Sequence, residues 1–362
     1  MIRWISALGL IATALFVSAQ APQSEPAAEP RIQLTLDASA AEAVLAIVEA
    51  RAADEPVAQA AWRRLFTSEP YLRLQKREAS LGRDFTDADF RAFVLSEELR
   101  GKAPALRRTL EEWKRADLQA IGLRILPYLP RDARVAAKVY PMIKPKTNSF
   151  VFEPATNPAI FLYLDPEQSR SEFENVVAHE SHHIGFAGLR DGSKERLASL
   201  PAHARQAAEW MGAFGEGVAV LAAAGSAEVH PLRDFKPEDR ARWDQDMQNG
   251  GSLPLLDQFF RDLVSGGFAR PEVADHVAFT FFGYRGPWYT VGYQMAALVE
   301  KQFGRAHLVE CMTDPRQLLA TYNEAAETHN ATSAQSLPLW SREVLQAVGA
   351  ESKGSSRPVN PR

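Results

Sequence analysis

The chain has 362 residues, of which 46% are hydrophobic and 24% are charged, and its formal net charge at pH 7 is −4. This length and hydrophobic content suffice for one large two-lobed domain or for two domains. The mild charge favours neither nucleic acid nor an anionic membrane as a partner. A single cysteine, Cys311, excludes an internal disulfide, so the core must stabilise the fold.

The first residues have the pattern of an export signal. An apolar run from Trp4 to Ala19 follows Arg3, is too short to cross a bilayer comfortably, and ends in small residues. We therefore expect a signal peptide at 1–19, a flexible spacer at 20–30, and a periplasmic or secreted protein with no stable membrane insertion after cleavage. An uncleaved anchor is the alternative. Cleavage removes Arg3 and no acid, which changes the formal charge from −4 to −5.

Residues 31–130 are predicted to form an N-terminal, mostly helical region without a catalytic motif. Residues 32–36 alternate between apolar and polar and predict a short strand. Helices are then predicted from Asp37 or Ser39 to Ala53, from Asp87 to Leu99 with Thr86 as N-cap, and from Ala105 to Leu126.

After residue 131 the spacing of hydrophobic residues changes from the helical period to that of strands. Residues 134–143, 148–153 and 159–164 are predicted to be strands. A helix follows, and the pattern Ser171-x-x-Glu174 predicts a capping box at its start.

That helix carries the motif His179-Glu180-Ser181-His182-His183. His179 and His183 lie about 40° apart around a helix and about 6 Å apart along it, so both rings can bind one metal ion. Only about 0.01 chance matches are expected in a chain of this composition. The neighbouring apolar residues turn this face towards the protein interior, which favours a metal site over a structural histidine cluster.

A catalytic zinc ion normally has a third protein ligand. A common continuation of the motif requires glycine and histidine at positions that are here Phe186 and Leu189, so that solution is excluded. Glu216 lies 33 residues after His183 among small and apolar residues, in a helix predicted from 201 to 224. Glu209, seven residues before Glu216, is the alternative ligand or an orienting partner, and His182 competes weakly with His183.

A later helix, opened by Gly286-Pro287 and ending near Phe303, carries Tyr289 and Tyr293 at i, i+4 spacing. Either phenol could donate to a developing oxyanion, and an aromatic core stripe is the alternative interpretation. Weaker candidates are Tyr284, Arg285, His276 and His307. Residues 351–362 are predicted to be a disordered tail.

Two segments of the sequence together resemble the gluzincin metallopeptidases, whose zinc is held by two motif histidines and a downstream glutamate. They are His179 to His183 and Glu216-Gly217-Val218-Ala219. The whole mature chain also resembles a bacterial family described as "putative zinc-dependent peptidases" of unknown function. The features that carry this likeness are Leu36 to Glu42, Trp62 with Tyr71 to Glu78, Tyr289 to Tyr293, and Asp314 to Ala325.

The resemblance implies His179, His183 and Glu216 as zinc ligands and Glu180 as general base. It implies an α+β, predominantly helical fold of the zincin type, in which a small β-sheet packs on the motif helix beside a mostly helical second lobe. Residues 131–350 would form this zincin-like core. The strand that anchors the substrate amine in aminopeptidases of the group has no counterpart in this sequence.

We therefore expect an exported zinc metallopeptidase that cleaves peptide or protein substrates through a zinc-bound water, with Glu180 as base and Tyr289 or Tyr293 at the oxyanion. The strand at 159–164 could be a sheet edge on which an extended peptide pairs. One alternative is an inactive periplasmic binding or scaffolding module with a structural or vestigial zinc site. Another is a hydrolase of non-peptide amides.

Overall fold

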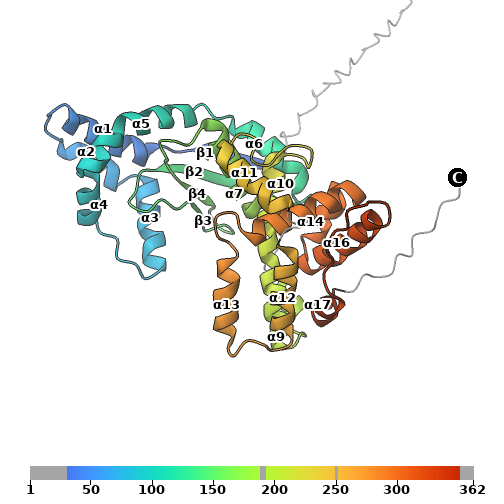
Figure 1. Ribbon diagram of the computed structural model, residues 1–362. Helices are drawn as coiled ribbons and strands as arrows, with labels where there is room; N and C mark the ends of the chain where they lie inside the picture. Colours follow the sequence, from blue (N-terminus) through green and yellow to red (C-terminus); the bar gives the residue numbers. More distant parts are fainter. Residues whose placement is uncertain (1–30, 188–192, 249–251, 351–362) are drawn as a thin grey trace, which may run out of the picture. The chain divides into compact units, whose positions relative to one another are not determined.

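A computed structural model describes residues 31–187, 193–248 and 252–350 (Figure 1). They belong to one compact unit, Arg31–Arg362. The predicted signal peptide, spacer and C-terminal tail lie outside the described residues, and these three assignments stay predictions. Within the described residues no helix combines the length and the apolar character needed to cross a membrane.

The chain is mostly helical with one mixed sheet, which confirms the predicted α+β class. The strands are β1 (Ile32–Leu36), β2 (Val135–Met142), β3 (Phe150–Phe152) and β4 (Ala159–Tyr163). Their order is β1-β2-β4-β3; β1 and β4 run parallel to β2, and β3 runs antiparallel to β4. The register pairs Leu34 with Ala137 and Val139 with Ile160.

The prediction that residues 159–164 form a sheet edge is wrong. β4 pairs with β2 on one side and with β3 on the other. A tight turn after β3 folds the chain back, with Glu153 at φ +52° and its carbonyl accepting from Thr156 and Asn157. Because this hairpin covers β4, β3 becomes the edge strand.

The helices before the motif are shorter than predicted. They are α1 (Ser39–Ala52), α2 (Gln59–Phe66), α3 (Glu69–Ser80), α4 (Asp87–Val94), α5 (Glu97–Trp113) and α6 (Leu118–Ile125), followed by the 3₁₀ turn η1 (Leu126–Tyr128). Thr86 caps α4 as predicted, by accepting from the Asp89 amide at 3.1 Å. The Ser96 and Asp117 side chains cap α5 and α6, so each long predicted helix is interrupted.

The motif helix α7 (Arg170–Ala187) is followed by the helices of the second half. These are α8 (Ser193–Leu197), α9 (Ala202–Met211), the 3₁₀ turn η3 (Gly212–Phe214), α10 (Gly215–Ala224), α11 (Pro237–Gln248), α12 (Leu253–Val264), α13 (Pro271–Thr280), α14 (Pro287–Phe303), α15 (Arg305–Cys311), α16 (Pro315–Asn330) and α17 (Arg342–Ala347). The single helix predicted from 201 to 224 is thus divided by η3. The predicted limits of α14 are confirmed, with Gly304 at φ +86° ending it.

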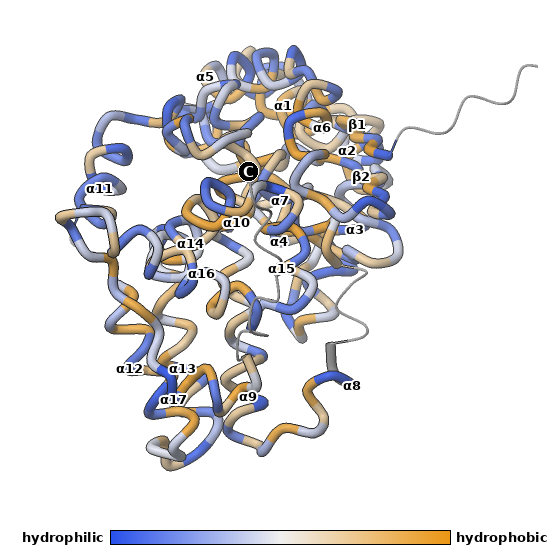
Figure 2. The backbone as a smooth tube through the Cα atoms, turned by 90° about the vertical axis from the view of Figure 1, so that its right-hand side faces the viewer, coloured by the Kyte–Doolittle hydropathy of each residue, from blue (hydrophilic) through white to orange (hydrophobic). Residues whose placement is uncertain are grey.

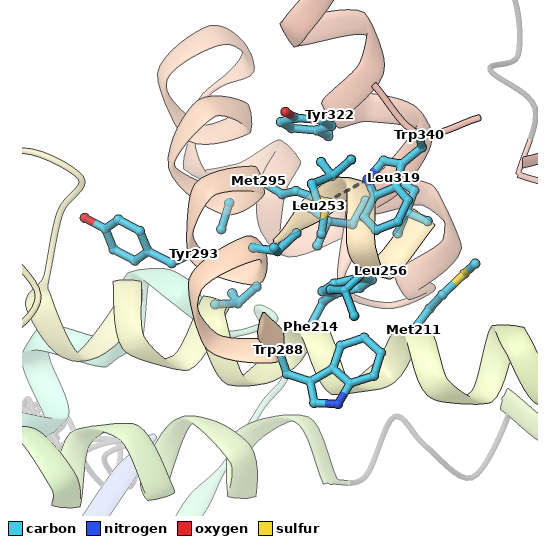
Figure 3. Packing of buried hydrophobic residues seen from close by; sticks show 14 of the residues in the cluster. Met211, Phe214, Leu253, Leu256, Trp288, Tyr293, Met295, Leu319, Tyr322 and Trp340 are labelled. Atoms are coloured by element: carbon cyan, nitrogen blue, oxygen red, sulfur yellow. Dashed lines mark hydrogen bonds between the residues drawn. The ribbon is translucent and has the colours of Figure 1, made fainter. Parts of the chain in front are cut away.

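The buried apolar residues form two clusters. The N-terminal core contains residues between Ala40 and Ile184 together with Ala223, and the C-terminal core contains residues between Leu197 and Ala350 together with Tyr128. The C-terminal core contains a group of aromatic rings, in which Phe214 contacts both Trp288 and Trp340 (Figure 3). Helix α7 packs against β2, β3 and β4 on one side and against α10 on another, which places the motif helix between the two cores. The predicted boundary near residue 130 stays a prediction.

Candidate metal centre

Helix α7 begins with a capping box, two residues earlier than predicted. The Ser169 amide donates to Glu172 at 2.7 Å and the Glu172 amide donates to Ser169 Oγ at 3.2 Å, so the box is Ser169-x-x-Glu172 rather than Ser171-x-x-Glu174. Phe173, Val177 and Ile184 anchor α7 in the N-terminal core. The helix is therefore held at both ends of the segment that carries the histidines.

Glu216, the candidate third ligand, stands on α10, which is held against α14 by two glycines. A Cβ atom on Gly217 would lie 2.1 Å from the Tyr293 amide nitrogen, and one on Gly292 would lie 2.6 Å from the Phe214 carbonyl oxygen. The two backbones therefore touch at this crossing, and only glycine fits at either position. Most of α10 is hydrophobic (Figure 2), which matches its burial, and Glu216 lies in its first turn.

His179, His183 and Glu216 converge at one point. The Nε2 atoms of the two histidines lie 3.1 Å apart, and Glu216 Oε2 lies 3.0 Å from that of His179 and 3.2 Å from that of His183. Tetrahedral zinc with ligand bonds near 2.05 Å separates neighbouring donors by about 3.3 Å. Two imidazole nitrogens and a carboxylate oxygen at this spacing fit zinc in both chemistry and size. Within the described ranges, no other group of His, Cys, Asp and Glu side chains is arranged to hold a metal ion.

The three donors remain within reach of solvent. The exposed fractions of the His179, His183 and Glu216 side chains are 14%, 21% and 20%. His183 and Glu216 also form part of the wall of a cavity of about 420 Å³. Its other walls are largely apolar, with Phe186 and Met312 among them. The candidate metal site is thus open on one side to a cavity in the size range of ligand-binding pockets.

Glu216 is held as a carboxylate. Its burial alone favours the neutral acid, but the charge of His183 and hydrogen bonds with both histidines outweigh burial and hold the pKa of Glu216 well below its usual range. An ionised carboxylate is the form that binds a metal ion. The ionised state of Glu216 and its position beside the two histidines therefore both suit a metal ligand.

The two candidate tyrosines have different surroundings. The Tyr289 ring stacks on His179 with 6.1 Å between the ring centroids. Burial is the main factor that raises the pKa of Tyr289 well above its usual value. The charge of Glu216, a hydrogen bond with Glu216 and the charge of Glu180 act in the same direction. Tyr293, which Figure 3 shows beside the C-terminal core, instead packs edge-on against Trp243 at 5.4 Å and lines a separate cavity. The structure brings Tyr289 to the candidate metal site and does not bring Tyr293 there.

Glu180 and His182 flank the ligands. The Glu180 carboxylate is partly exposed and makes no hydrogen bond or ion pair with any residue that the structure describes. His182 is 2% exposed and packs on Phe186, with 4.9 Å between ring centroids. Burial and the charges of His183 and His179 hold the pKa of His182 well below its usual value. His182 thus faces the interior and does not join the donor triangle.

The remaining candidates other than Arg285 do not join the triangle. Glu209 is exposed and lines the cavity, because η3 breaks the helix that would have aligned it with Glu216. His276 and His307 are exposed, and the Tyr284 hydroxyl donates to Asp239 at 2.8 Å. Sequence reasoning missed the crossing of α10 and α14, although the glycine that follows Glu216 was a signal of close backbone approach.

Comparisons with known proteins agree with this site. A search of the curated proteins and a search of the solved structures find no match. A family model described as "Putative zinc dependent peptidase (DUF5700)" matches residues 41–331, a range that contains the motif helix, Glu216 and Tyr289. The chain therefore belongs to this family.

Proposed function

We propose that the chain is a peptidase of the gluzincin type, with zinc held by His179, His183 and Glu216. The convergence of these three side chains from α7 and α10, with donor atoms 3.0–3.2 Å apart, is the observation that carries the proposal. Peptide substrates follow from the family to which the chain belongs.

The donor set supports a catalytic site over a structural one. Structural zinc sites are closed by four protein ligands, whereas catalytic sites have three and keep one position open. Within the described part of the chain the cluster contains three donors, each partly exposed, and a cavity borders two of them. This arrangement leaves room for water and for a substrate.

Two side chains beside the ligands have the properties required for amide hydrolysis. Zinc bound here would act as a Lewis acid that lowers the pKa of water and polarises the scissile carbonyl. Glu180 offers a carboxylate that no described residue engages, so it can accept the proton of the attacking water and pass it to the leaving amine. Tyr289, whose raised pKa keeps its phenol protonated, can donate a hydrogen bond to the oxyanion.

The surroundings also offer binding surfaces for a peptide. β3 is an edge strand, so its outer backbone groups can pair with an extended chain. The cavity beside His183 and Glu216 has largely apolar walls that suit one apolar side chain. Both features favour a peptide over a charged small molecule.

The test is Glu180→Gln, with Glu174→Gln on the same helix as the matched control. We expect Glu180→Gln to retain about one zinc per chain and to lose peptide hydrolysis by about 1,000-fold or more, because proton transfer is removed while the ligands stay intact. Glu174, which pairs with Arg170 at 3.6 Å, should tolerate the same change. Zinc content by mass spectrometry and cleavage of a broad peptide library are the measurements.

Two results would contradict the proposal. Turnover retained in Glu180→Gln would remove the role of general base from that residue. A parent protein that binds zinc yet cleaves no peptide would instead favour a binding or scaffolding module.

A further inference from the structure

Arg285 stands out among the residues near the site because its charge has no partner. It makes no hydrogen bond and no ion pair with any described residue, and its Nη1 atom is buried. The guanidinium lies over the Phe235 ring at 4.2 Å and near the Tyr284 ring at 5.7 Å. Aromatic contacts compensate only part of the cost of burying a cation.

The two nearest carboxylates are engaged elsewhere. Asp239 and Glu172 both act electrostatically on Arg285. Asp239 accepts from the Tyr284 hydroxyl at 2.8 Å, and Glu172 accepts from the Ser169 amide at 2.7 Å in the capping box of α7. Neither forms a salt bridge with Arg285, so the guanidinium keeps its capacity to bind an anion.

The backbone holds Arg285 in this place under strain. Its φ is +54°, in the left-handed region that is unfavourable for a residue with a Cβ atom. It stands between Gly283, at φ +39°, and Gly286, the N-cap residue of α14. Strain of this kind, together with a partly buried cation that has no ion-pair partner among the described residues, is common at binding sites, where the surrounding fold maintains a costly conformation.

Its location is beside the metal centre. The charge of Arg285 acts on the Tyr289 phenol, which Glu216 and Glu180 also influence. Arg285 precedes Tyr289 by four residues, and the Tyr289 ring stacks on His179. Arg285 thus stands just before the helix that carries Tyr289 to the candidate metal site.

We propose that Arg285 binds a carboxylate of the peptide substrate, either its C-terminal carboxylate or an acidic side chain. The guanidinium fork suits a carboxylate because it can donate two parallel hydrogen bonds. The inference rests on the proposed peptidase function and names the substrate class of the same site.

The experiment measures binding in a background that does not turn over. Zinc-loaded full-length Glu180→Gln is titrated by calorimetry with the N-acetyl peptide Ala-Ala-Phe-Ala-Ala as free acid, as C-terminal amide, and as amides that carry one Glu at successive positions. We expect the free acid or one of the Glu peptides to bind at least about tenfold more tightly than the plain amide. Preference for the free acid identifies the C-terminal carboxylate, and preference for a Glu peptide identifies a side chain.

Variants assign that preference to Arg285. Arg285→Leu, which keeps an apolar contact with Phe235, should abolish the preference, and Arg285→Lys should keep part of it if the leucine variant does not fold. Arg242→Leu is the matched control, because Arg242 lies over the same Tyr284 ring at 5.4 Å but is exposed. Equal affinity for all peptides, or a preference retained in a folded Arg285→Leu, would overturn the proposal. Because no step requires hydrolysis, this result is independent of the peptidase test.

Discussion

Tyr289 and Tyr293 differ at the scale of single residues in a way that kinetics can measure. Tyr289 stacks on a metal-ligand histidine, whereas Tyr293 packs on Trp243. We expect Tyr289→Phe to lower kcat by about 100-fold with a small change in KM, because one hydrogen-bond donor to the oxyanion is removed. Tyr293→Phe removes the same atom elsewhere and should leave kcat unchanged. Equal kcat in the Tyr289→Phe variant and the parent would assign the ring a packing role only.

Glu78 provides a pH-dependent test of stability at the same scale. Its side chain is 6% exposed and pairs with Arg77, with Arg83 at 3.4 Å and with Lys146 at 3.4 Å. Burial opposes ionisation, but hydrogen bonds and charge from Arg77 and Lys146 prevail and lower the pKa of Glu78 below its ordinary 4.5. A depressed folded-state pKa stabilises the fold above the unfolded value, and this contribution is lost as the pH falls through the folded value.

We therefore expect Glu78→Gln to lower the free energy of unfolding by about 2 kcal/mol at pH 7, with the difference shrinking below about pH 4.5. Urea unfolding of both proteins between pH 3 and pH 7 is the measurement. Glu98→Gln is the control, because Glu98 pairs with Lys102 on an exposed helix face and should change stability little at any pH. A pH-independent difference for Glu78→Gln would mean that packing, and not charge, is lost.

At the scale of elements, the crossing of α10 and α14 positions Glu216, the candidate third ligand. Gly217→Ala would place a methyl group 2.1 Å from the Tyr293 amide nitrogen, so the helices must separate. We expect a loss of about 2–4 kcal/mol in unfolding free energy and weaker zinc binding, since Glu216 moves with α10. Gly101→Ala in α5, where a Cβ atom meets nothing within 4 Å, should be neutral or slightly stabilising. Unchanged zinc affinity in Gly217→Ala would show that the helix crossing does not position Glu216 for zinc binding.

The elements that local sequence signals define were predictable, and the pairings between elements were not. Alternation and caps predicted four strands and the limits of α14, because these signals act within a few residues. The order β1-β2-β4-β3 joins strands about 100 residues apart, and no local pattern reveals which strand takes the edge. Likewise the i, i+4 spacing of Tyr289 and Tyr293 suggests one shared face, yet only Tyr289 stacks on a histidine, whereas Tyr293 packs on Trp243. His179, His183 and Glu216 were accessible to sequence reasoning because metal chemistry restricts ligand types and spacing.

At the scale of the whole described unit, the candidate metal ligands come from both sides of the fold. His179 and His183 stand on α7, which is anchored in the N-terminal core, and Glu216 stands on α10, whose apolar residues belong mainly to the C-terminal core. Glu216 faces the two histidine rings at 3.0–3.2 Å in a partly buried space. A metal ion that binds all three would therefore link the two cores as well as support catalysis.

This linkage predicts that zinc removal destabilises the whole unit rather than the site alone. Zinc at about 1,000 times its dissociation constant adds about 4 kcal/mol to the folded state, so 1,10-phenanthroline should lower the melting temperature by several degrees. Intrinsic tryptophan fluorescence reports the change on both sides, since Trp113 lies in the N-terminal core and Trp288 in the C-terminal core. Glu216→Gln should melt at a lower temperature and respond less to the chelator, whereas the exposed His203→Gln should behave as the parent does. An equal chelator response in Glu216→Gln and the parent would show that Glu216 does not connect the cores through the metal.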